Sequence, residues 1–481
     1  MDPCQYQEIE CNTAHNEDRK QVIKSALKQT LIASVSWTHF FLAGLCVGSP
    51  TVIIPQLRKE ENSTIIIDDE MGSWLYSTGG FAIYPWIFIL PLFTKQYGRK
   101  ISQTVTSVVS LTIFIILYFS TNPYHILISE VFQGFLSGGN MTIRILILAE
   151  YASIKYRGAF LAIKAASFFW GIWFSNAIGT FFYWKNIAIF GIICSLYTFI
   201  FVFCPESPYW LASKGRIEEC KKSHRWLYGC NKRTEKEVQE IIDSYKRNAE
   251  KIGFIEMCKS KEFYKPLILS VLAVIQYNFS GKVVCSLYIL DIFKSITRKE
   301  STAYIVMLIL DGVTVFGMYF GSLLSRFLKR RTLYFCSSFM GVIFLFIISF
   351  YLYLVRFSVV TENNYVTIAL LVIYSMSLSC GPLILSAAIY GELIPIKFQA
   401  TSYIFTGLTF TICFSMLLKL TPVMFASFGM HGTFLFYGVT CGLCTIYLYV
   451  NMPETKNKTH EGIAMFFRGE NNKLEEMISL K

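Results

Sequence analysis

Five ionisable side chains stand inside long apolar runs of this sequence, where a charge is costly. On scales of helix insertion, a charged residue near the centre of a bilayer costs on the order of 2.5 to 3.5 kcal/mol. Each side chain must therefore pair with an opposite charge, extend to the polar boundary or face water. The five residues are Glu130, Arg144, Lys164, Lys282 and Asp311.

Two pairs among these residues have competing interpretations. Glu130 and Arg144 lie toward opposite ends of one apolar run, so their side chains could extend to the two polar boundaries rather than serve a site. Lys282 lies too deep in its run to reach a boundary easily. It therefore faces a binding cavity or forms a structural pair with Asp311 on the next run, and the sequence does not favour either interpretation.

A second set of charged residues lies where apolar runs end. Side chains at such positions can form ion pairs that hold helix ends together in one conformation and break in another. The alternative is that they anchor helix ends at the membrane surface, where an exposed pair contributes about 0 to 1 kcal/mol. These positions by themselves favour the anchors. The residues are Arg99, Glu150, Arg157, Glu206, Arg330, Glu392 and Glu454.

The composition is that of a membrane protein. Of the 481 residues, 53% are hydrophobic and only 16% are charged, against roughly 25% charged in soluble domains. The net charge of +12 does not indicate nucleic-acid binding, because the basic residues fall in short interruptions between apolar runs. The lipid bilayer is the expected partner.

The apolar runs that position these charges are each long enough to cross a hydrocarbon core of about 30 Å. They predict an all-α membrane protein with twelve transmembrane helices, six on each side of a charged interval. The runs are 31–54, 71–94, 102–120, 125–149, 158–182, 187–204, 266–291, 302–325, 332–354, 366–390, 400–423 and 430–451.

This pattern predicts five segments. They are an N-terminal tail (1–30), a six-helix bundle (31–204), a linker (205–265), a second bundle (266–451) and a C-terminal tail (452–481). Within the linker, Arg216 to Leu227 and Thr234 to Lys251 have the spacing of short amphipathic helices.

The loop charges predict the orientation. Lysines and arginines gather in the loops of one side, which the positive-inside rule assigns to the cytoplasm together with both tails. We therefore expect a multi-pass protein of the cell membrane. Asn62-Ser63-Thr64, in the first outer loop, is a predicted glycosylation site on Asn62.

The two halves repeat a sequence pattern. Pro205-Glu206, after the first six runs, is echoed by Pro453-Glu454 after the last six, at an offset of 453 minus 205, or 248 residues. Glu150 is echoed by Glu392, at 392 minus 150, or 242 residues. Gly98-Arg99-Lys100 is echoed by Leu328-Lys329-Arg330, at 328 minus 98, or 230 residues. One offset that drifts with loop length indicates a tandem duplication of one six-helix unit.

Six short motifs follow one another along the sequence. They are Gly98-Arg99-Lys100, Glu150 with Arg157-Gly158, Pro205 to Leu211, Ser280-Gly281, Gly381-Pro382 and Pro453 to Lys456. In these motifs the sequence resembles the sugar-porter branch of the major facilitator superfamily, the family of the facilitative glucose transporters. Within it, the stretches Ala43 to Leu57 and Glu70 to Leu75 are most similar to insect facilitated trehalose transporters.

The resemblance implies a carrier that works by alternating access, with a cavity along the fifth and seventh helices. It also implies that the seven charged residues at the ends of the runs, from Arg99 to Glu454, form a cytoplasmic gate. It implies substrate contacts from Lys164, Tyr277, Asn278, Lys282 and Asp311. Several of the family's sugar-binding positions hold other residues here, so we expect trehalose or another glycoside to be a better substrate than a simple hexose. The replaced positions are Ala165, Tyr277, Asn278, Val283 and Ala387.

We expect facilitated diffusion of a sugar, because the first run has no Asp or Glu where proton-coupled relatives hold one. Two alternatives are a non-transporting sensor on the same fold and a carrier of a small organic anion. The short C-terminal tail argues against the sensor. No catalytic or phosphate-binding motif is found, so we expect neither an enzyme nor a cofactor or metal.

Overall fold

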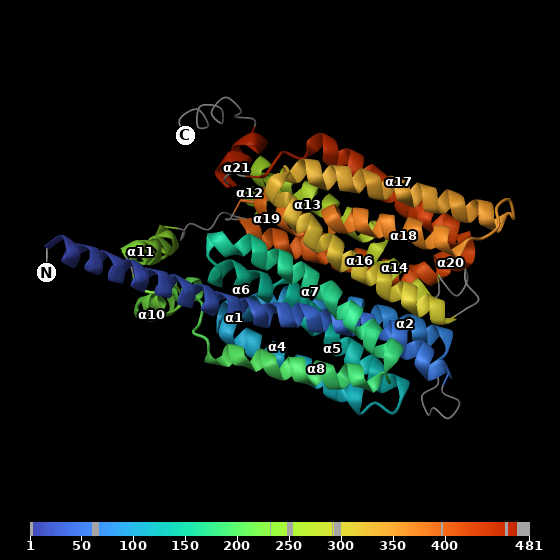
Figure 1. Cartoon of the computed structure of the whole chain (residues 1–481), viewed down its shortest axis with the longest axis horizontal. Coiled ribbons are helices and arrows are strands. Elements are labelled where there is room, and N and C mark those ends of the chain that lie inside the picture. Colours follow the sequence, from blue (N-terminus) through green and yellow to red (C-terminus); the bar gives the residue numbers. More distant parts are fainter. Residues whose placement is uncertain are drawn as a thin grey trace.

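The computed structural model describes residues 3–59, 67–230, 232–247, 254–290, 292, 300–395, 398–456 and 460–468. Every regular element in these ranges is a helix, as the apolar runs predict, and the helices form two bundles that lie side by side (Figure 1). The predicted glycosylation site at Asn62 lies outside the described residues.

The first bundle and the linker follow the predicted order. The bundle consists of α1 (Pro3–Lys59), α2 (Asp69–Phe81), α3 (Tyr84–Tyr97), α4 (Arg99–Tyr118), α5 (Pro123–Met141), α6 (Ile143–Tyr151), α7 (Ile154–Phe181), α8 (Lys185–Thr198) and η1 (Phe199–Phe203). The linker holds α9 (Pro208–Ser213), α10 (Ile217–Tyr228), α11 (Lys232–Arg247) and α12 (Phe254–Lys259).

The second bundle ends in a short helix after the last span. Its elements are α13 (Lys261–Phe279), α14 (Lys282–Leu287), α16 (Glu300–Phe327), α17 (Arg330–Arg356), α18 (Asn364–Leu378), η2 (Ser379–Leu383), α19 (Ile384–Leu393), α20 (Gln399–Asn451) and α21 (His460–Arg468).

Eleven helices in the described ranges are long and apolar enough to cross a membrane. The last of them, Thr401–Asn451, contains both final predicted runs. It consists of two helical segments that meet at a kink at Gly429, where φ is 70° and ψ is 175°. The described helices therefore account for the twelve predicted spans.

Several spans are broken near their middle, and the breaks have local causes. The span α13–α14 changes direction at Gly281, whose φ of 74° is left-handed and favours a residue without Cβ. The span α18–α19 passes through the π-helical turn η2, which contains Pro382. Breaks of this kind free backbone groups and space in the interior of a bundle.

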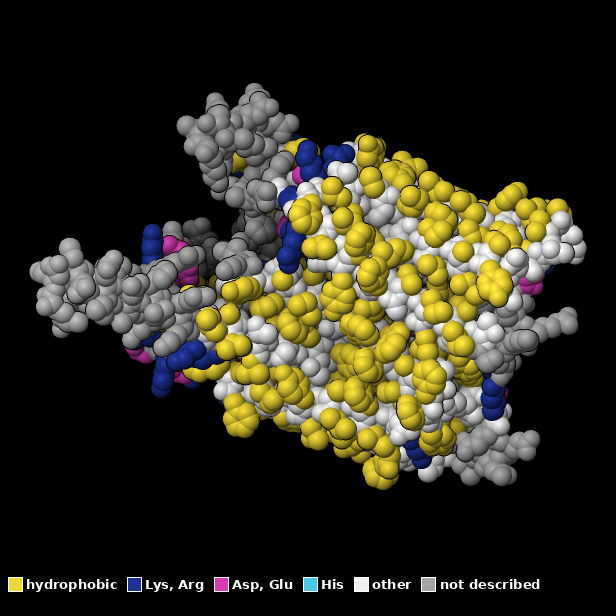
Figure 2. Space-filling view, viewed as in Figure 1, with side chains coloured by type: hydrophobic (Ala, Val, Ile, Leu, Met, Phe, Trp, Pro, Cys, Tyr) yellow, Lys and Arg dark blue, Asp and Glu magenta, His cyan; other side chains and the backbone are white. Residues whose placement is uncertain are grey.

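The surface has the layout expected in a bilayer. Figure 2 shows hydrophobic side chains over the length of both bundles and charged side chains gathered at the two ends. Large apolar groups such as Phe203, Val450 and Phe327 are strongly exposed, which a soluble protein would not tolerate in such number. They face the space that lipid would occupy.

Helices lie at both linker positions where the sequence predicts them, although residues 248–251 of the second lie outside the described residues. α10 and α11 pack their apolar faces together with α9, burying Cys220, Val238 and Ile242. Near the middle of α1, the Lys28 Nζ donates to the carbonyl oxygen of Trp226 on α10 at 2.8 Å and lies over its ring. The linker helices are thereby held beside α1, at the left in Figure 1.

Glu130 and Arg144 do not extend to the polar boundaries, so that interpretation is wrong. Their exposed fractions are 3% and 0%, because the tightly packed N-terminal bundle encloses both.

Candidate functional site

A cavity lies between the two bundles, and both contribute to its wall. Its empty space, the open mouth included, is about 1140 Å³. From the first bundle the lining residues are Phe40, Ala43, Val47, Ile83, Ser137, Asn140, Met141, Ile145, Lys164, Ala165, Phe168 and Phe169. From the second they are Val274, Tyr277, Met318, Leu383, Ser386, Tyr403, Thr406, Gly407, Phe410 and Phe414.

The polar groups of this wall are few and mostly neutral. Lys164 is its one cation among the described lining residues, and its Nζ lies 4.7 Å from the centre of the Phe40 ring. Tyr277 and Tyr403 supply phenolic hydroxyls from the second bundle, and Asn140 supplies an amide from the first. Aromatic walls with a few convergent polar groups are typical of small-molecule sites.

The structure places two of the predicted contact residues, Lys164 and Tyr277, on the cavity wall. The other three lie elsewhere. The Asn278 side chain is buried, and its amide donates to the carbonyl oxygen of Val274, one turn earlier in the same helix, at 2.9 Å. Lys282 and Asp311 are enclosed at 2% and 3% exposure and are not lining residues of the cavity.

Lys282 and Asp311 belong to one buried network. The Lys282 Nζ donates to the Ser286 hydroxyl at 3.0 Å, and this hydroxyl is hydrogen bonded to Asp311. The Asp311 Oδ2 accepts from the Asn176 amide at 2.7 Å. Asn176 lies on α7 and Asp311 on α16, so the network joins the two bundles.

Sequence reasoning missed Asn176. A single Asn in an apolar run is a weak signal, because asparagines inside helices also bond to their own backbone. Only the approach of α7 to α16 shows that this amide bonds to Asp311.

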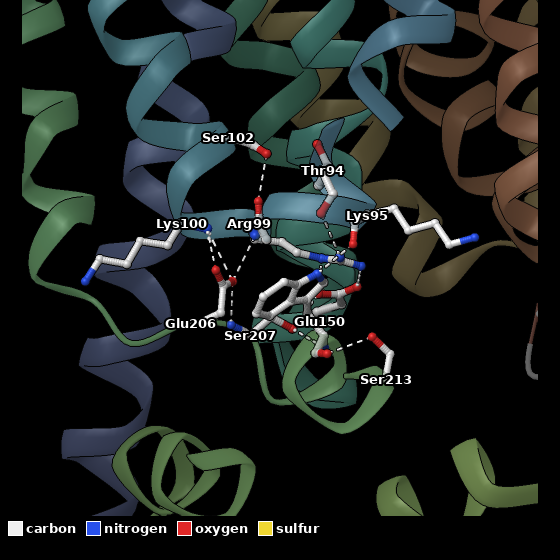
Figure 3. A network of polar contacts seen from close by, with 11 residues as sticks. Thr94, Lys95, Arg99, Lys100, Ser102, Glu150, Glu206, Ser207 and Ser213 are labelled. Atoms are coloured by element: carbon white, nitrogen blue, oxygen red, sulfur yellow. Dashed lines mark hydrogen bonds and ion pairs between the residues drawn. The ribbon is translucent and has the colours of Figure 1, made fainter. Parts of the chain in front are cut away.

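The charged motifs of the first half form a compact cluster at one end of the bundle, shown in Figure 3. Arg99 donates from Nε and Nη2 to the two carboxylate oxygens of Glu150 at 2.9 and 2.5 Å. The Ser207 hydroxyl donates to the same carboxylate. A bidentate guanidinium–carboxylate pair fixes both distance and orientation.

Glu206 caps the start of α4 in this cluster. Its carboxylate accepts from the backbone N–H of Arg99 at 2.9 Å and of Lys100 at 3.1 Å (Figure 3). Burial raises the pKa of Glu206, while these N–H bonds and the charge of Arg99 oppose the rise. A negative charge at a helix N-terminus satisfies free backbone N–H donors and interacts favourably with the helix dipole.

The second half repeats the arrangement. Arg330 forms an ion pair with Glu392, as Arg99 does with Glu150. Glu454 accepts from the backbone N–H of Arg331 at 3.2 Å, at the start of α17, as Glu206 does at the start of α4. The duplication read from the sequence therefore has a structural counterpart.

We call the end of the bundles that carries these two clusters the motif end. The predicted gate residues all lie there, and both ion pairs join elements of the same half. Arg157, the remaining gate residue, donates from Nη2 to the carbonyl oxygen of Ala149 at 2.6 Å.

Contacts across the two halves occur at the other end. The Thr51 hydroxyl donates to the carbonyl oxygen of Leu287 at 3.1 Å. The rings of Tyr76 and Tyr288 lie 4.7 Å apart. These contacts bring α1 and α2 against the second bundle beyond the cavity.

A two-bundle helical membrane protein with a central cavity and repeated charged motifs has the architecture of a major facilitator transporter. Residues 87–467 match the family described as sugar (and other) transporter, and the chain belongs to that family. It is therefore a transmembrane carrier and not an enzyme.

Curated relatives extend over nearly the full chain. A facilitated trehalose transporter, Tret1, of Apis mellifera ligustica is 24% identical over 97% of this chain and 95% of its own length. The Tret1 of Polypedilum vanderplanki is 25% identical, over 92% and 90%. The sugar transporter ERD6-like 6 of Arabidopsis thaliana is 26% identical over 78% of both chains.

Solved structures agree in fold. The proton:xylose symporter XylE bound to 6-bromo-6-deoxy-D-glucose has a TM-score of 0.74 and 16% identity, and the alignment covers 92% of this chain and 100% of XylE. A partially occluded, inward-open XylE from E. coli has a TM-score of 0.70 and 14% identity.

Proposed function

We propose that the chain carries a sugar, trehalose or a related glycoside, by alternating access and facilitated diffusion. The observation that carries this proposal is the cavity between the bundles, whose wall both halves supply. A solute bound there contacts both halves at once. Movement of one half against the other would then expose it to either side of the membrane.

The chemistry of the wall supports a glycoside. Aromatic faces such as Phe40 and Phe410 suit the C–H faces of sugar rings, and Tyr277, Tyr403 and Asn140 offer neutral partners for hydroxyls. Ala165 occupies a position where the resemblance leads us to expect an amide. With fewer fixed partners for hydroxyls, discrimination among small hexoses falls and a larger glycoside with more contacts is favoured.

The contacts between halves support a switching mechanism. We propose that the motif end faces the cytoplasm, with both termini, and that the protein resides in the cell membrane. The contacts at the other end, Thr51 with Leu287 and Tyr76 with Tyr288, separate when the cavity opens outward. The clusters of Arg99 and Arg330 then control the inner mouth.

Lys164 favours a second candidate substrate. A buried ammonium on the cavity wall would attract a small organic anion, since the described lining residues include no carboxylate. This candidate differs from the sugar proposal only in substrate, so one assay addresses both.

Uptake into proteoliposomes of the purified protein tests the proposal. Labelled trehalose, glucose, fructose and small organic anions are compared, with protein-free vesicles as the control. Saturable trehalose uptake that stops at equilibrium supports facilitated diffusion of a glycoside. Accumulation above equilibrium that a protonophore abolishes contradicts uniport, and saturable binding without uptake would mean a sensor.

A further inference from the structure

The central cavity is not uniform along its length, because its polar and aromatic side chains lie at different depths. Both α7 and α20 begin at the motif end, four residues after Glu150 and seven residues after Glu392. A helix rises about 1.5 Å per residue, so the position of a lining residue in its helix gives its approximate depth from that end. The order of the lining residues along each helix therefore shows how the chemistry of the wall changes with depth.

Along α20 the polar lining residues come first and the aromatic ones follow. Tyr403 and Thr406 lie four and seven residues after Gln399, at depths of about 6 and 10 Å. Phe410 and Phe414 lie eleven and fifteen residues after it, at about 16 and 22 Å.

The first bundle shows the same order on its side of the cavity. Lys164 lies ten residues after the start of α7, at about 15 Å, whereas Phe168 and Phe169 lie at about 21 and 22 Å. Asn140 precedes Glu150 by ten residues, so its depth is close to that of Lys164. Helices of both bundles thus carry polar groups nearer the motif end and phenylalanines deeper in the cavity.

The deep aromatic side chains form one group in each bundle. In the second bundle, the Phe410 ring stacks on the Phe414 ring, with centroids 5.7 Å apart, and its centroid lies 5.8 Å from that of the Tyr277 ring. In the first bundle, the rings of Phe168 and Phe169 meet edge to face, with centroids 5.5 Å apart. We call these five lining residues the aromatic part of the cavity.

The side chains nearer the motif end have a different recognition chemistry, and we call them the polar part. They offer one ammonium, one amide and three hydroxyls, which suit the hydroxyls of a sugar ring. The aromatic part offers ring faces and a single polar group, the Tyr277 hydroxyl. The polar part consists of Asn140, Lys164, Ser386, Tyr403 and Thr406.

A second hydroxylated ring is poorly matched to the aromatic part. The Ser137 side chain, thirteen residues before Glu150, adds one hydroxyl at a similar depth among the described lining residues. The second glucose ring of trehalose would bury several hydroxyls there with few partners, and a buried hydroxyl without a partner is costly. An aromatic group needs no such partners and gains free energy when it leaves water.

We propose that the preferred substrate is a glycoside with an aromatic aglycone, which binds with its sugar in the polar part and its aglycone in the aromatic part. This substrate class rests on the proposed function, a carrier whose substrate site is the central cavity. From Tyr403 to Phe414 the lining of α20 spans eleven residues, or about 16 Å, which leaves room for the two groups in line.

Equilibrium binding to the purified protein in lipid nanodiscs tests the substrate class without a transport step. Labelled phenyl α-D-glucoside is displaced with unlabelled phenyl α-D-glucoside, methyl α-D-glucoside, trehalose or phenol, and empty nanodiscs measure partition into lipid. We expect the phenyl glucoside to compete at about a tenth of the concentration that methyl glucoside or trehalose requires, because its ring leaves water. Phenol alone should compete poorly, because it has no sugar for the polar part.

Two variants locate the aglycone. Phe410→Ala should remove most of the advantage of the phenyl over the methyl glucoside and leave the affinity for the methyl glucoside little changed. Phe405→Ala is the matched control, because Phe405 lies on the same helix, is exposed and is not a lining residue; it should keep the ranking of the parent. If Phe410→Ala does not fold, Phe410→Leu, which removes the ring and keeps an apolar side chain, should reduce the same advantage.

The proposal fails if the phenyl glucoside does not bind saturably, or if methyl and phenyl glucosides compete at equal concentrations. Equal competition by phenol and the phenyl glucoside also overturns it, as does an unchanged ranking in the Phe410 variant that folds. Uptake of the same glycosides into proteoliposomes tests the carrier separately. The expected ranking in binding without uptake of any glycoside contradicts the proposed function and keeps the ligand class, whereas uptake without a preference for the phenyl glucoside contradicts only the ligand class.

Discussion

Replacing Lys282 with Gln separates a structural role for this lysine from a role in substrate binding. The structure supports the structural role, because the ammonium bonds to Ser286, and through it to Asp311, away from the cavity wall. In Lys282→Gln the Asp311 carboxylate, at 3% exposure, keeps only neutral partners. The variant keeps a polar donor on a somewhat shorter side chain and removes the charge.

The expected magnitude follows from the burial of both groups. Removing one member of a buried charge pair costs about 3 to 5 kcal/mol, because it leaves an uncompensated charge. For a folding unit of about 200 residues, each kcal/mol lowers Tm by roughly 2 to 4 °C. Lys282→Gln should therefore lower the apparent Tm by about 6 to 20 °C and reduce surface expression, whereas the double variant Lys282→Gln with Asp311→Asn should recover most of both.

The assay combines thermal unfolding in detergent, surface labelling and uptake of labelled trehalose and glucose per molecule at the surface. Lys164→Gln is the matched control, since it removes a buried lysine that lines the cavity. It should alter substrate selectivity with little change in Tm. The reasoning is refuted if Lys282→Gln keeps the Tm of the parent but changes selectivity, because a cavity role would give that result.

Three further variants test the cluster, the break and the wall. Arg99→Gln should slow transport several-fold and leave substrate affinity within a few-fold, because its pair with Glu150 lies at the motif end; a large loss of affinity at normal turnover in flux and binding assays would contradict this. Gly281→Ala should lower the free energy of unfolding by about 1 to 2 kcal/mol, because its φ is 74° and a Cβ there would lie 2.6 Å from the Tyr437 ring. Gly158→Ala, where a Cβ would meet open space, is the control and should not; equal melting curves for the two variants would contradict this reasoning. Tyr277→Phe should raise KM for trehalose several-fold without loss of expression, and unchanged concentration-dependent uptake would remove this hydroxyl from the site.

Much of the fold could be predicted from the sequence. Apolar runs of about 20 residues report the spans directly, since any spanning helix must satisfy its backbone groups internally. The repetition of Pro205-Glu206 as Pro453-Glu454 predicts the duplication. In the structure, each glutamate accepts hydrogen bonds at the N-terminus of the helix that forms the third span of its half. The linker helices were also predictable, because their apolar spacing is local.

The candidate site was predicted only in part. Lys164 and Tyr277 line the cavity, but Lys282 lies in a network whose other members include Asn176, about a hundred residues earlier in the chain. The sequence places these residues at similar depths in the membrane. It does not report the rotation of each helix about its axis, which decides whether a side chain faces the cavity, a neighbouring helix or lipid.

The sequence by itself determined the membrane class, the six-plus-six organisation, the charged motifs and their repetition, because each depends on composition or on spacing within a short stretch. Tertiary structure alone decided which charges meet. It enclosed Arg144 within the first bundle and paired Arg99 with Glu150 inside one half rather than across the two. Those outcomes depend on how the helices pack, and packing is set by all the contacting surfaces together.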